Sequence, residues 1–272
     1  MLMRTIPPAW LAVAVLALLL TAFAAKLAVS RLLHPAPAGA AAAEKLQYLP
    51  GGATGVDVSW PQCDSQQLPA DILGYAVIGV NGGRITSRND CLEGQFAWAK
   101  QADSVPHVYM NTNAPPDGYK HEFCPNDPAC AYYQWGWDHT RATVAYARSK
   151  NADARYWWLD VETGNYWSNN VFLNAEVLQG AIDYLKSTGH IIGIYSTPRQ
   201  WGIIAGNYRP HLPNWTAGAA DLAEAKKRCT AQYAFGGGTV VMVQYVSEEF
   251  DTNYVCPGGV FRGLAIPGLG AD

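Results

Sequence analysis

Short apolar runs alternate along the chain with longer amphipathic stretches. The clearest apolar run is Arg155–Glu162, which reads Arg-Tyr-Trp-Trp-Leu-Asp-Val-Glu. It has no helical periodicity, so it predicts a buried strand. Similar runs predict seven further strands, at Gly55–Ser59, Tyr75–Val80, Val105–Thr112, Ile191–Thr197, Leu212–Ala217, Gln232–Phe235 and Val240–Val246.

Amphipathic stretches between these runs predict helices. Leu173–Ser187 places its large apolar side chains on one face, and Gly189 follows as a stop signal. The other predicted helices are Leu92–Ala102, Tyr132–Lys150 and Asp221–Cys229. Strands that alternate with helices are typical of the α/β class and of a parallel sheet, which here predicts a (β/α)8 TIM-type barrel. The barrel would be small, with several helices short or missing. A doubly wound open sheet is the alternative.

The first residues predict export. Arg4 precedes an apolar run, Trp10–Ala25, which is shorter than the roughly twenty residues of a membrane span. Small residues suited to a cleavage site occur at Ala22–Ala24 and Ala38–Ala40. We therefore expect residues 1–34 to be a signal peptide or an N-terminal membrane anchor, 35–54 an Ala/Pro/Gly-rich linker, and 55–272 the folded domain, on the extracellular or cell-wall side.

The six cysteines predict disulfides, because an even cysteine count in an exported chain usually forms them. The sequence alone allows many connectivities. We favour pairing in sequential order, Cys63 with Cys91, Cys124 with Cys130, and Cys229 with Cys256. Zinc binding is the alternative, but the chain has no Cys-x-x-Cys pair.

The net charge and the absence of several motifs argue against some classes of function. The net charge of −3 argues against a nucleic-acid partner. The sequence has no phosphate loop, no metalloprotease helix and no Gly-x-Ser-x-Gly nucleophile elbow. We therefore expect no cofactor and no metal, a monomer, and contact with a membrane only through the N-terminal segment.

Two carboxylates stand at the end of the clearest strand. Side chains alternate along a strand, so Asp160 and Glu162 point to the same side. Buried carboxylates are unfavourable unless a site uses them. Such a pair suits cleavage of a glycosidic bond, in which one acid protonates the leaving oxygen and a carboxylate supports the cation-like centre. The alternative is a solvated strand end whose acids pair with Lys or Arg.

Other polar and aromatic residues follow the same strand ends, where TIM barrels carry their active sites. The expected acids are Asp57, Asp160 and Glu162, with Asp251 in the loop beyond the last strand. The chain is rich in aromatic residues, with ten Trp and fifteen Tyr, whose ring faces can stack on sugars. The expected substrate-binding residues are Tyr109, Asn111, Tyr195, Trp215, Gln244 and Tyr245.

These segments together resemble glycoside hydrolase family 25, the lysozyme-type muramidases. The resemblance extends from Gly55 to Asn253 and rests on Gly55–Trp60, Leu159–Glu162, Ile194–Ser196, Asn214–Ala217, Gln244-Tyr245 and Asp251-x-Asn253. Two features depart from that family. The third strand ends Tyr109-Met110-Asn111, where the family carries a Tyr-His-Phe-like ending, and the loop 113–131 is longer than usual.

The resemblance implies an exported hydrolase that cleaves β-1,4 bonds of peptidoglycan or a related amino-sugar polymer. Glu162 would be the general acid, Asp160 would stabilise or orient the reacting sugar, and Asp57 and Asp251 would complete an acidic floor. A non-catalytic protein that binds cell-wall glycan on the same barrel is the alternative, and a structural envelope protein without a glycan ligand is a third. The complete set of acids favours the enzyme, whereas the altered third strand favours the binding protein.

Overall fold

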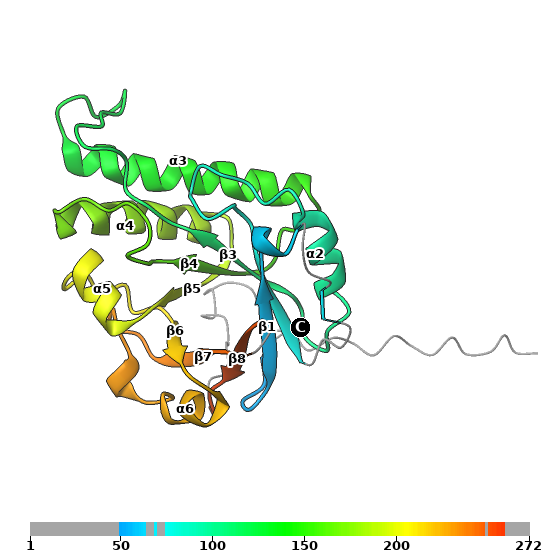
Figure 1. The fold of residues 1–272 in the computed structure, drawn as a ribbon. Coiled ribbons are helices and arrows are strands. Elements are labelled where there is room, and N and C mark those ends of the chain that lie inside the picture. The colour runs from blue at the N-terminus through cyan, green and yellow to red at the C-terminus, as the bar shows by residue number, and fades with distance from the viewer. Residues whose placement is uncertain (1–48, 64–67, 70–73, 248–249, 259–272) are drawn as a thin grey trace, which may run out of the picture. The chain divides into compact units, whose positions relative to one another are not determined.

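Eight strands close into a barrel in chain order (Figure 1). The computed structural model describes residues 49–63, 68–69, 74–247 and 250–258. The strands are β1 (Thr54–Val58), β2 (Tyr75–Gly79), β3 (His107–Asn111), β4 (Tyr156–Asp160), β5 (Ile191–Ser196), β6 (Asn214–Ala219), β7 (Val240–Val246) and β8 (Asp251–Val255). Neighbours from β1 to β7 are parallel, whereas β8 runs antiparallel to both β7 and β1. The predicted α/β barrel is confirmed, with one strand reversed.

Helices of unequal length surround the barrel. In Figure 1 the two longest, α3 and α4, run side by side along one side, whereas α5 and α6 are short. The helices are α2 (Leu92–Ala99), α3 (Pro128–Ser149), α4 (Val171–Ser187), α5 (Pro198–Ile204) and α6 (Leu222–Lys227), with short 3-10 turns at Trp60–Gln62 and Ala231–Tyr233. The expected shortening of several helices is therefore observed.

The closing part of the barrel differs from the prediction. Gln232–Phe235 was expected to be a strand, but residues 231–233 form a 3-10 turn in which Tyr233 N and Ala234 N donate to carbonyl oxygens three residues earlier. The eighth strand is instead Asp251–Val255. It follows β7 after a short connection, which suffices for an antiparallel pair but not for the crossover that a parallel pair needs. Helix α5 was also not predicted.

Strand alternation builds the core in two shells. Along β4, Tyr156 and Trp158 face the barrel interior, whereas Trp157 and Leu159 pack outward in the main helix-facing cluster. Space for the Trp158 ring comes from Gly193 on β5, where a Cβ atom would lie 2.2 Å from the ring. The interior is therefore filled with aromatic side chains below the carboxyl ends of the strands.

Three disulfides join Cys63 to Cys91, Cys124 to Cys130, and Cys229 to Cys256, with Cα–Cα distances of 5.5–5.7 Å. The sequential pairing is thus confirmed, and it excludes zinc binding by these thiols. The bridges attach the turn after β1 to the start of α2, the loop before α3 to the first turn of that helix, and the segment after α6 to the residue that follows β8.

The N-terminal predictions fall mostly outside the described residues. Residues 1–48 are not described, so the signal peptide or anchor and most of the linker stay predictions. Leu49, inside the predicted linker range, is buried with the barrel-interior cluster. Within the described ranges, none of the helices combines the length and the apolar character that crossing a membrane requires.

Candidate active site

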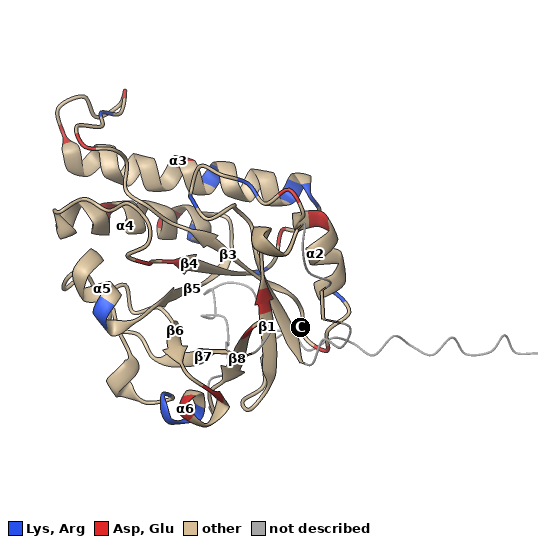
Figure 2. Cartoon of the chain, viewed as in Figure 1, with Lys and Arg blue, Asp and Glu red and all other residues tan. Residues whose placement is uncertain are grey.

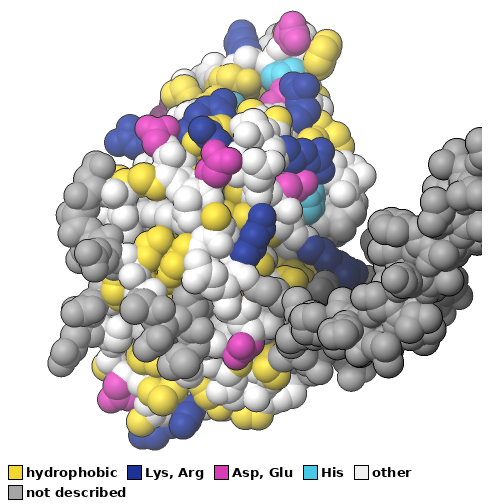
Figure 3. Space-filling model, turned by 90° about the vertical axis from the view of Figure 1, so that its right-hand side faces the viewer, with side chains coloured by type: hydrophobic (Ala, Val, Ile, Leu, Met, Phe, Trp, Pro, Cys, Tyr) yellow, Lys and Arg dark blue, Asp and Glu magenta, His cyan; other side chains and the backbone are white. Residues whose placement is uncertain are grey.

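The carboxyl ends of the strands surround a cavity of about 270 Å³. Asp57, Asp160, Glu162 and Asp251 line it together, as the sequence predicted for one face of the barrel. Figure 2 shows acidic residues on β1, at the end of β4 and on β8. None of the described residues that line this cavity is Lys or Arg. By contrast, acidic and basic side chains intermingle on the face shown in Figure 3. The acids therefore do not form the solvated ion pairs that were the alternative.

Hydrogen bonds from both neighbouring strands fix the backbone around the acid pair. Thr112 donates to the Asp160 carbonyl oxygen from its backbone N at 3.0 Å and from Oγ1 at 2.6 Å. On the other side, Ser196 Oγ donates to the Val161 carbonyl oxygen at 2.7 Å. The indole of Trp167 donates to the Glu162 carbonyl oxygen at 2.9 Å. The backbone that carries the two carboxylates is thus held on both sides.

Asp160 is the more deeply buried of the pair, with 4% of its surface exposed. Asn111 Nδ2 donates to its Oδ2, and Asn81 clamps the Asn111 backbone, which orients the amide. Its other oxygen, Oδ1, is buried and accepts no hydrogen bond within the described part of the chain. Burial, followed by the negative charges of Glu162 and Asp57, raises the pKa of Asp160 well above its usual value.

Glu162 lies two residues beyond, in the loop after β4, and is only partly buried. Burial raises the pKa of its carboxyl and the charge of Asp251 adds to the increase, while contacts with Gln200 and Tyr195 partly offset it. A carboxyl that is reachable from the cavity and holds its proton at higher pH has the properties of a general acid.

Asp57 and Asp251 face each other across the β1–β8 pair, where they are in register. Asp57 Oδ2 accepts hydrogen bonds from Asn253 Nδ2 at 2.7 Å and from Gln244 Nε2 at 3.1 Å. Burial and the Asp251 charge nevertheless raise the pKa of Asp57 to about 7. The expected position of Asp251 in a loop is wrong, because it is the first residue of β8, and the antiparallel register places it beside Asp57.

The predicted aromatic residues form one wall of the cavity. The Trp215 ring contacts those of Tyr195 and Tyr109, with centroid distances of 4.5 and 6.2 Å. Tyr195 donates to Gln244 Oε1 at 2.7 Å, which connects this wall to the amide that holds Asp57. Tyr245 does not line the cavity. Strand alternation turns it outward, against the cluster beneath α6.

Some lining or supporting residues were not assigned by the sequence. Trp60, in the turn after β1, lines the cavity with 51% of its surface exposed, as expected of a ring that meets a ligand. Asn253 is fully buried and bridges Asp57 to the indole of Trp215, which donates to its Oδ1 at 2.8 Å. Asn253 lies two residues after Asp251. If this segment is predicted to be a strand, alternation places both side chains on the same face.

Within the described residues, no group of three or more His, Cys, Asp or Glu side chains is arranged to hold a metal ion. The acids are instead surrounded by amides, aromatic rings and one another. This arrangement suits proton transfer and the stabilisation of positive charge.

Comparison with known proteins identifies the family of the chain. The model of the family described as lysozyme-like protein 1 matches residues 105–244, about half of the 272-residue chain. A probable GH family 25 lysozyme 4 of Dictyostelium discoideum is 35% identical over 82 residues, which are 29% of this chain and 38% of that protein. A probable GH family 25 lysozyme 2 of the same organism is 35% identical over 79 residues, 27% of this chain and 35% of that protein. The matched region thus spans less than two-fifths of either curated relative.

Solved structures share the fold at low sequence identity. The Clostridium perfringens spore cortex lytic enzyme SleM aligns with a TM-score of 0.54 and 13% identity, over 75% of this chain and 67% of that one. A family GH25 lysozyme from Aspergillus fumigatus aligns with a TM-score of 0.50 and 15% identity, over 75% of this chain and 93% of that one. The family match, the fold and the resemblance noted in the sequence agree, and the chain belongs to the lysozyme-like protein 1 family.

Proposed function

We propose that this protein is a glycoside hydrolase of the muramidase type, which cleaves β-1,4 bonds of peptidoglycan or a related amino-sugar polymer. One observation carries the proposal. A partly exposed carboxyl with a raised pKa, Glu162, stands beside a buried carboxyl, Asp160, in a cavity whose described lining has no cation. Membership of a lysozyme-like family supports the same chemistry.

In this proposal Glu162 is the general acid. Its proton passes to the glycosidic oxygen as the bond between that oxygen and the anomeric carbon breaks. Water then adds to the anomeric carbon and gives one proton to the Glu162 carboxylate, which restores the acid. The raised pKa of Glu162 keeps the proton available at higher pH than for an exposed glutamate. Its partial exposure leaves the carboxyl accessible to a substrate in the cavity.

Asp160 has a different part, because it is buried and held by Asn111. Asn111 occupies one carboxylate oxygen, and Oδ1 has no hydrogen-bond partner among the described residues. We assign to the Asp160 carboxylate the orientation of the reacting sugar through its acetamido group. Asp57 and Asp251 complete an acidic floor that favours the cation-like transition state.

The aromatic wall of the acidic cavity would bind the sugar. Tyr195 and the buried Trp215 line the cavity beside the acids, and Trp60 stands at the exposed edge. Asn111 and Gln244 offer amide groups for sugar hydroxyls, although each also supports a carboxylate. Tyr245 has no place in this set, since it faces away from the cavity.

We also propose that the protein works outside the cytoplasm as a monomer. Three disulfides and membership of a lysozyme-like family support an extracellular location. The apolar run at Trp10–Ala25 would direct export, by a cleaved signal peptide or a retained anchor. Fractionation of the native host tests this, because a pool confined to the cytosol would contradict it.

The activity is tested by incubating the purified chain with purified peptidoglycan and measuring new reducing ends in the soluble fragments. Release of muropeptides with a new reducing end at the β-1,4 bond is the expected result. Binding to peptidoglycan without any release would instead support the non-catalytic glycan-binding protein. Absence of both binding and release would refute a glycan function.

A further inference from the structure

A second cavity, of about 680 Å³, adjoins the acidic one along two loops. We call it the loop pocket. It is lined by Arg84, Thr86, Asn113, Ala114, Pro116, Trp135, Gly164, Asn165 and Tyr166. Gly83 and Glu162 line the acidic cavity. Arg84, which follows Gly83, and Gly164, two residues beyond Glu162, line the loop pocket. A polymer that lies across Glu162 therefore has a second depression beside it.

Hydrogen bonds fasten together the three loops that form the loop pocket. Asn113 Oδ1 accepts from Ile85 N at 3.0 Å, and the Asn113 carbonyl oxygen accepts from the Trp135 indole at 3.0 Å. Ala114 N donates to the Tyr166 carbonyl oxygen at 2.9 Å. The loops after β2, β3 and β4 are thus held in place without a ligand, so the loop pocket is preformed.

The loop pocket has a charge opposite to that of the acidic cavity. Arg84 is exposed, is the only charged side chain of the described lining, and forms no ion pair within the described residues. Asp117 contacts the Tyr166 hydroxyl nearby but is not paired with Arg84. A guanidinium without a partner in a preformed concave site is suited to a carboxylate, which it can bind through two parallel hydrogen bonds.

Aromatic rings accompany this cation. Tyr166 is 49% exposed although it is a large ring, and Trp135 is partly buried with its indole N–H already bonded. The exposed ring can stack on the C–H face of a sugar, while Arg84 meets an anionic substituent of the same polymer. The adjoining acidic cavity would repel an anionic substituent. The charges of the two cavities therefore favour one placement of the glycan polymer.

We propose that the loop pocket is a carboxylate-specific subsite, in which Arg84 binds a carboxylate carried by the glycan strand next to the bond that is cleaved. The inference rests on the proposed function and names the part of the substrate that sets specificity. It predicts a preference for amino-sugar polymers with carboxylate substituents over neutral ones of the same linkage.

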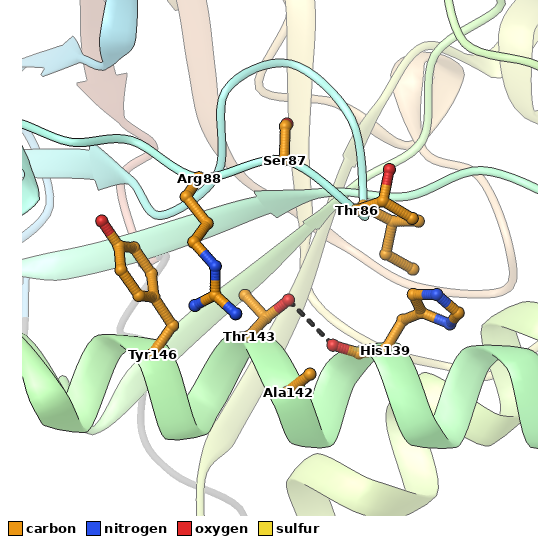
Figure 4. Close-up of a pocket in the computed structure, with 8 residues that line it drawn as sticks. Thr86, Ser87, Arg88, His139, Ala142, Thr143 and Tyr146 are labelled. Carbon is orange, nitrogen blue, oxygen red and sulfur yellow. Dashed lines mark hydrogen bonds between the residues drawn. The ribbon is translucent and has the colours of Figure 1, made fainter.

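A matched control lies on the same loop. Figure 4 shows Arg88 extending from this loop toward α3, beside Tyr146 and away from the loop tip. Its guanidinium carbon lies 4.5 Å from the centre of the Tyr146 ring, in a separate cavity of about 160 Å³. Arg88→Gln therefore removes the same charge from the same loop without touching the loop pocket.

The test measures binding of two soluble peptidoglycan glycan fragments to the purified full chain by calorimetry. One fragment has free carboxylates and the other has them converted to amides. Wild type should prefer the free carboxylates about tenfold, the effect of one charge-assisted contact at an exposed site. Arg84→Gln should abolish this preference and leave affinity for the amidated fragment unchanged. Arg88→Gln should keep the preference, and thermal unfolding confirms that each variant is folded.

Three results would overturn the subsite. In the first, wild type binds both fragments with equal affinity. In the second, Arg84→Gln weakens binding of both fragments equally. In the third, Arg88→Gln removes the preference for free carboxylates as completely as Arg84→Gln does. Failure of the subsite is distinct from failure of the proposed function, because reducing-end release from peptidoglycan by wild type is measured separately. Release without a carboxylate preference overturns only the subsite.

Discussion

Glu162 and Asp160 have different environments although only Val161 separates them in the sequence. The strand ends at Asp160, which is buried and held by Asn111, whereas Glu162 has passed into the loop and reaches the cavity. The difference in accessibility separates the two roles. In the proposed mechanism, the accessible carboxyl exchanges a proton with the substrate and the buried one orients the sugar.

Glu162→Gln should therefore abolish proton donation while it preserves the shape of the cavity. General acid catalysis contributes about 10²–10⁴-fold, so kcat for peptidoglycan should fall by about that factor while fragment binding persists. Reducing-end release and calorimetry measure the two quantities. Asp103→Asn, an exposed carboxylate just after α2, is the control and should retain full activity. Full turnover by Glu162→Gln would exclude this residue as the acid.

The raised pKa of Asp57 makes the stability of the protein depend on pH. Its pKa is about 7 in the folded protein against an ordinary value of 3.8, because burial and Asp251 disfavour the charged form. Between these two values the unfolded chain loses the proton while the folded protein keeps it, so wild-type stability falls as the pH rises from about 4 to 7. Below and above this window the contribution is constant.

Asp57→Asn should remove that dependence, because the amide cannot ionise. The free energy of unfolding of the variant relative to wild type should rise across this window, by up to about 4 kcal/mol at 1.36 kcal/mol for each pKa unit. Urea unfolding at pH 4, 5.5, 7 and 8 measures it. A difference between the two proteins that stays flat with pH would contradict the burial argument.

At the scale of elements, the apolar strands could be predicted and the polar one could not. β2 is a continuous apolar run, and β4 is apolar up to Asp160, because both faces of these strands are buried. β8 reads Asp-Thr-Asn-Tyr-Val, because its inward positions 251 and 253 face Asp57 rather than the hydrophobic core. A strand that serves the site does not have the hydrophobic pattern of a strand, so Asp251 was expected in a loop.

The site residues could be predicted where they follow apolar strands. Asp160, Tyr195 and Trp215 come from runs whose alternation fixes their direction. Tyr245 shows the limit of this reasoning, because the run Val240–Val246 is apolar on both faces and does not reveal which of Gln244 and Tyr245 turns inward. The loop pocket lay beyond prediction, since it depends on hydrogen bonds between loops that are distant in sequence.

Helices α3 and α4 approach each other closely through glycine. A Cβ atom at Gly180 would lie 2.0 Å from the Tyr133 carbonyl oxygen, and one at Gly136 would lie 1.9 Å from that of Val177. Gly180→Ala should force the helices apart and destabilise the protein by about 1–3 kcal/mol, as overpacking does. Denaturant unfolding measures the change.

A second glycine gives the opposite expectation. Gly94 lies in α2 with nothing within 4 Å of a Cβ placed there. Gly94→Ala should therefore stabilise the protein by about 0.5–1 kcal/mol, because alanine loses less conformational freedom in a helix. The same substitution should thus change stability in opposite directions at the two positions. A similar loss at both would show that helix packing is not the cause of the Gly180 effect.

For the whole molecule, the disulfides tie the closing regions of the barrel to its helices. Cys229–Cys256 joins the residues after α6 and after β8, and Cys63–Cys91 joins the turn that carries Trp60 to the start of α2. Their loops, with separations of 27 and 28 residues, are longer than the separation of 6 at Cys124–Cys130. Restriction of the unfolded chain increases with loop length, so the two long loops should contribute more.

Paired serine substitutions should separate the three bridges. In the chain-entropy model, loss of either long loop removes about 3–4 kcal/mol and loss of Cys124–Cys130 about 2 kcal/mol, as measured by urea unfolding without reductant. Cys63→Ser with Cys91→Ser should in addition raise KM for peptidoglycan, because it frees the turn that holds Trp60 at the edge of the acidic cavity. Cys124→Ser with Cys130→Ser, whose bridge closes a loop away from that cavity, should leave KM unchanged. Equal KM values for these two double variants would show that the Cys63–Cys91 bridge stabilises the fold without positioning the substrate.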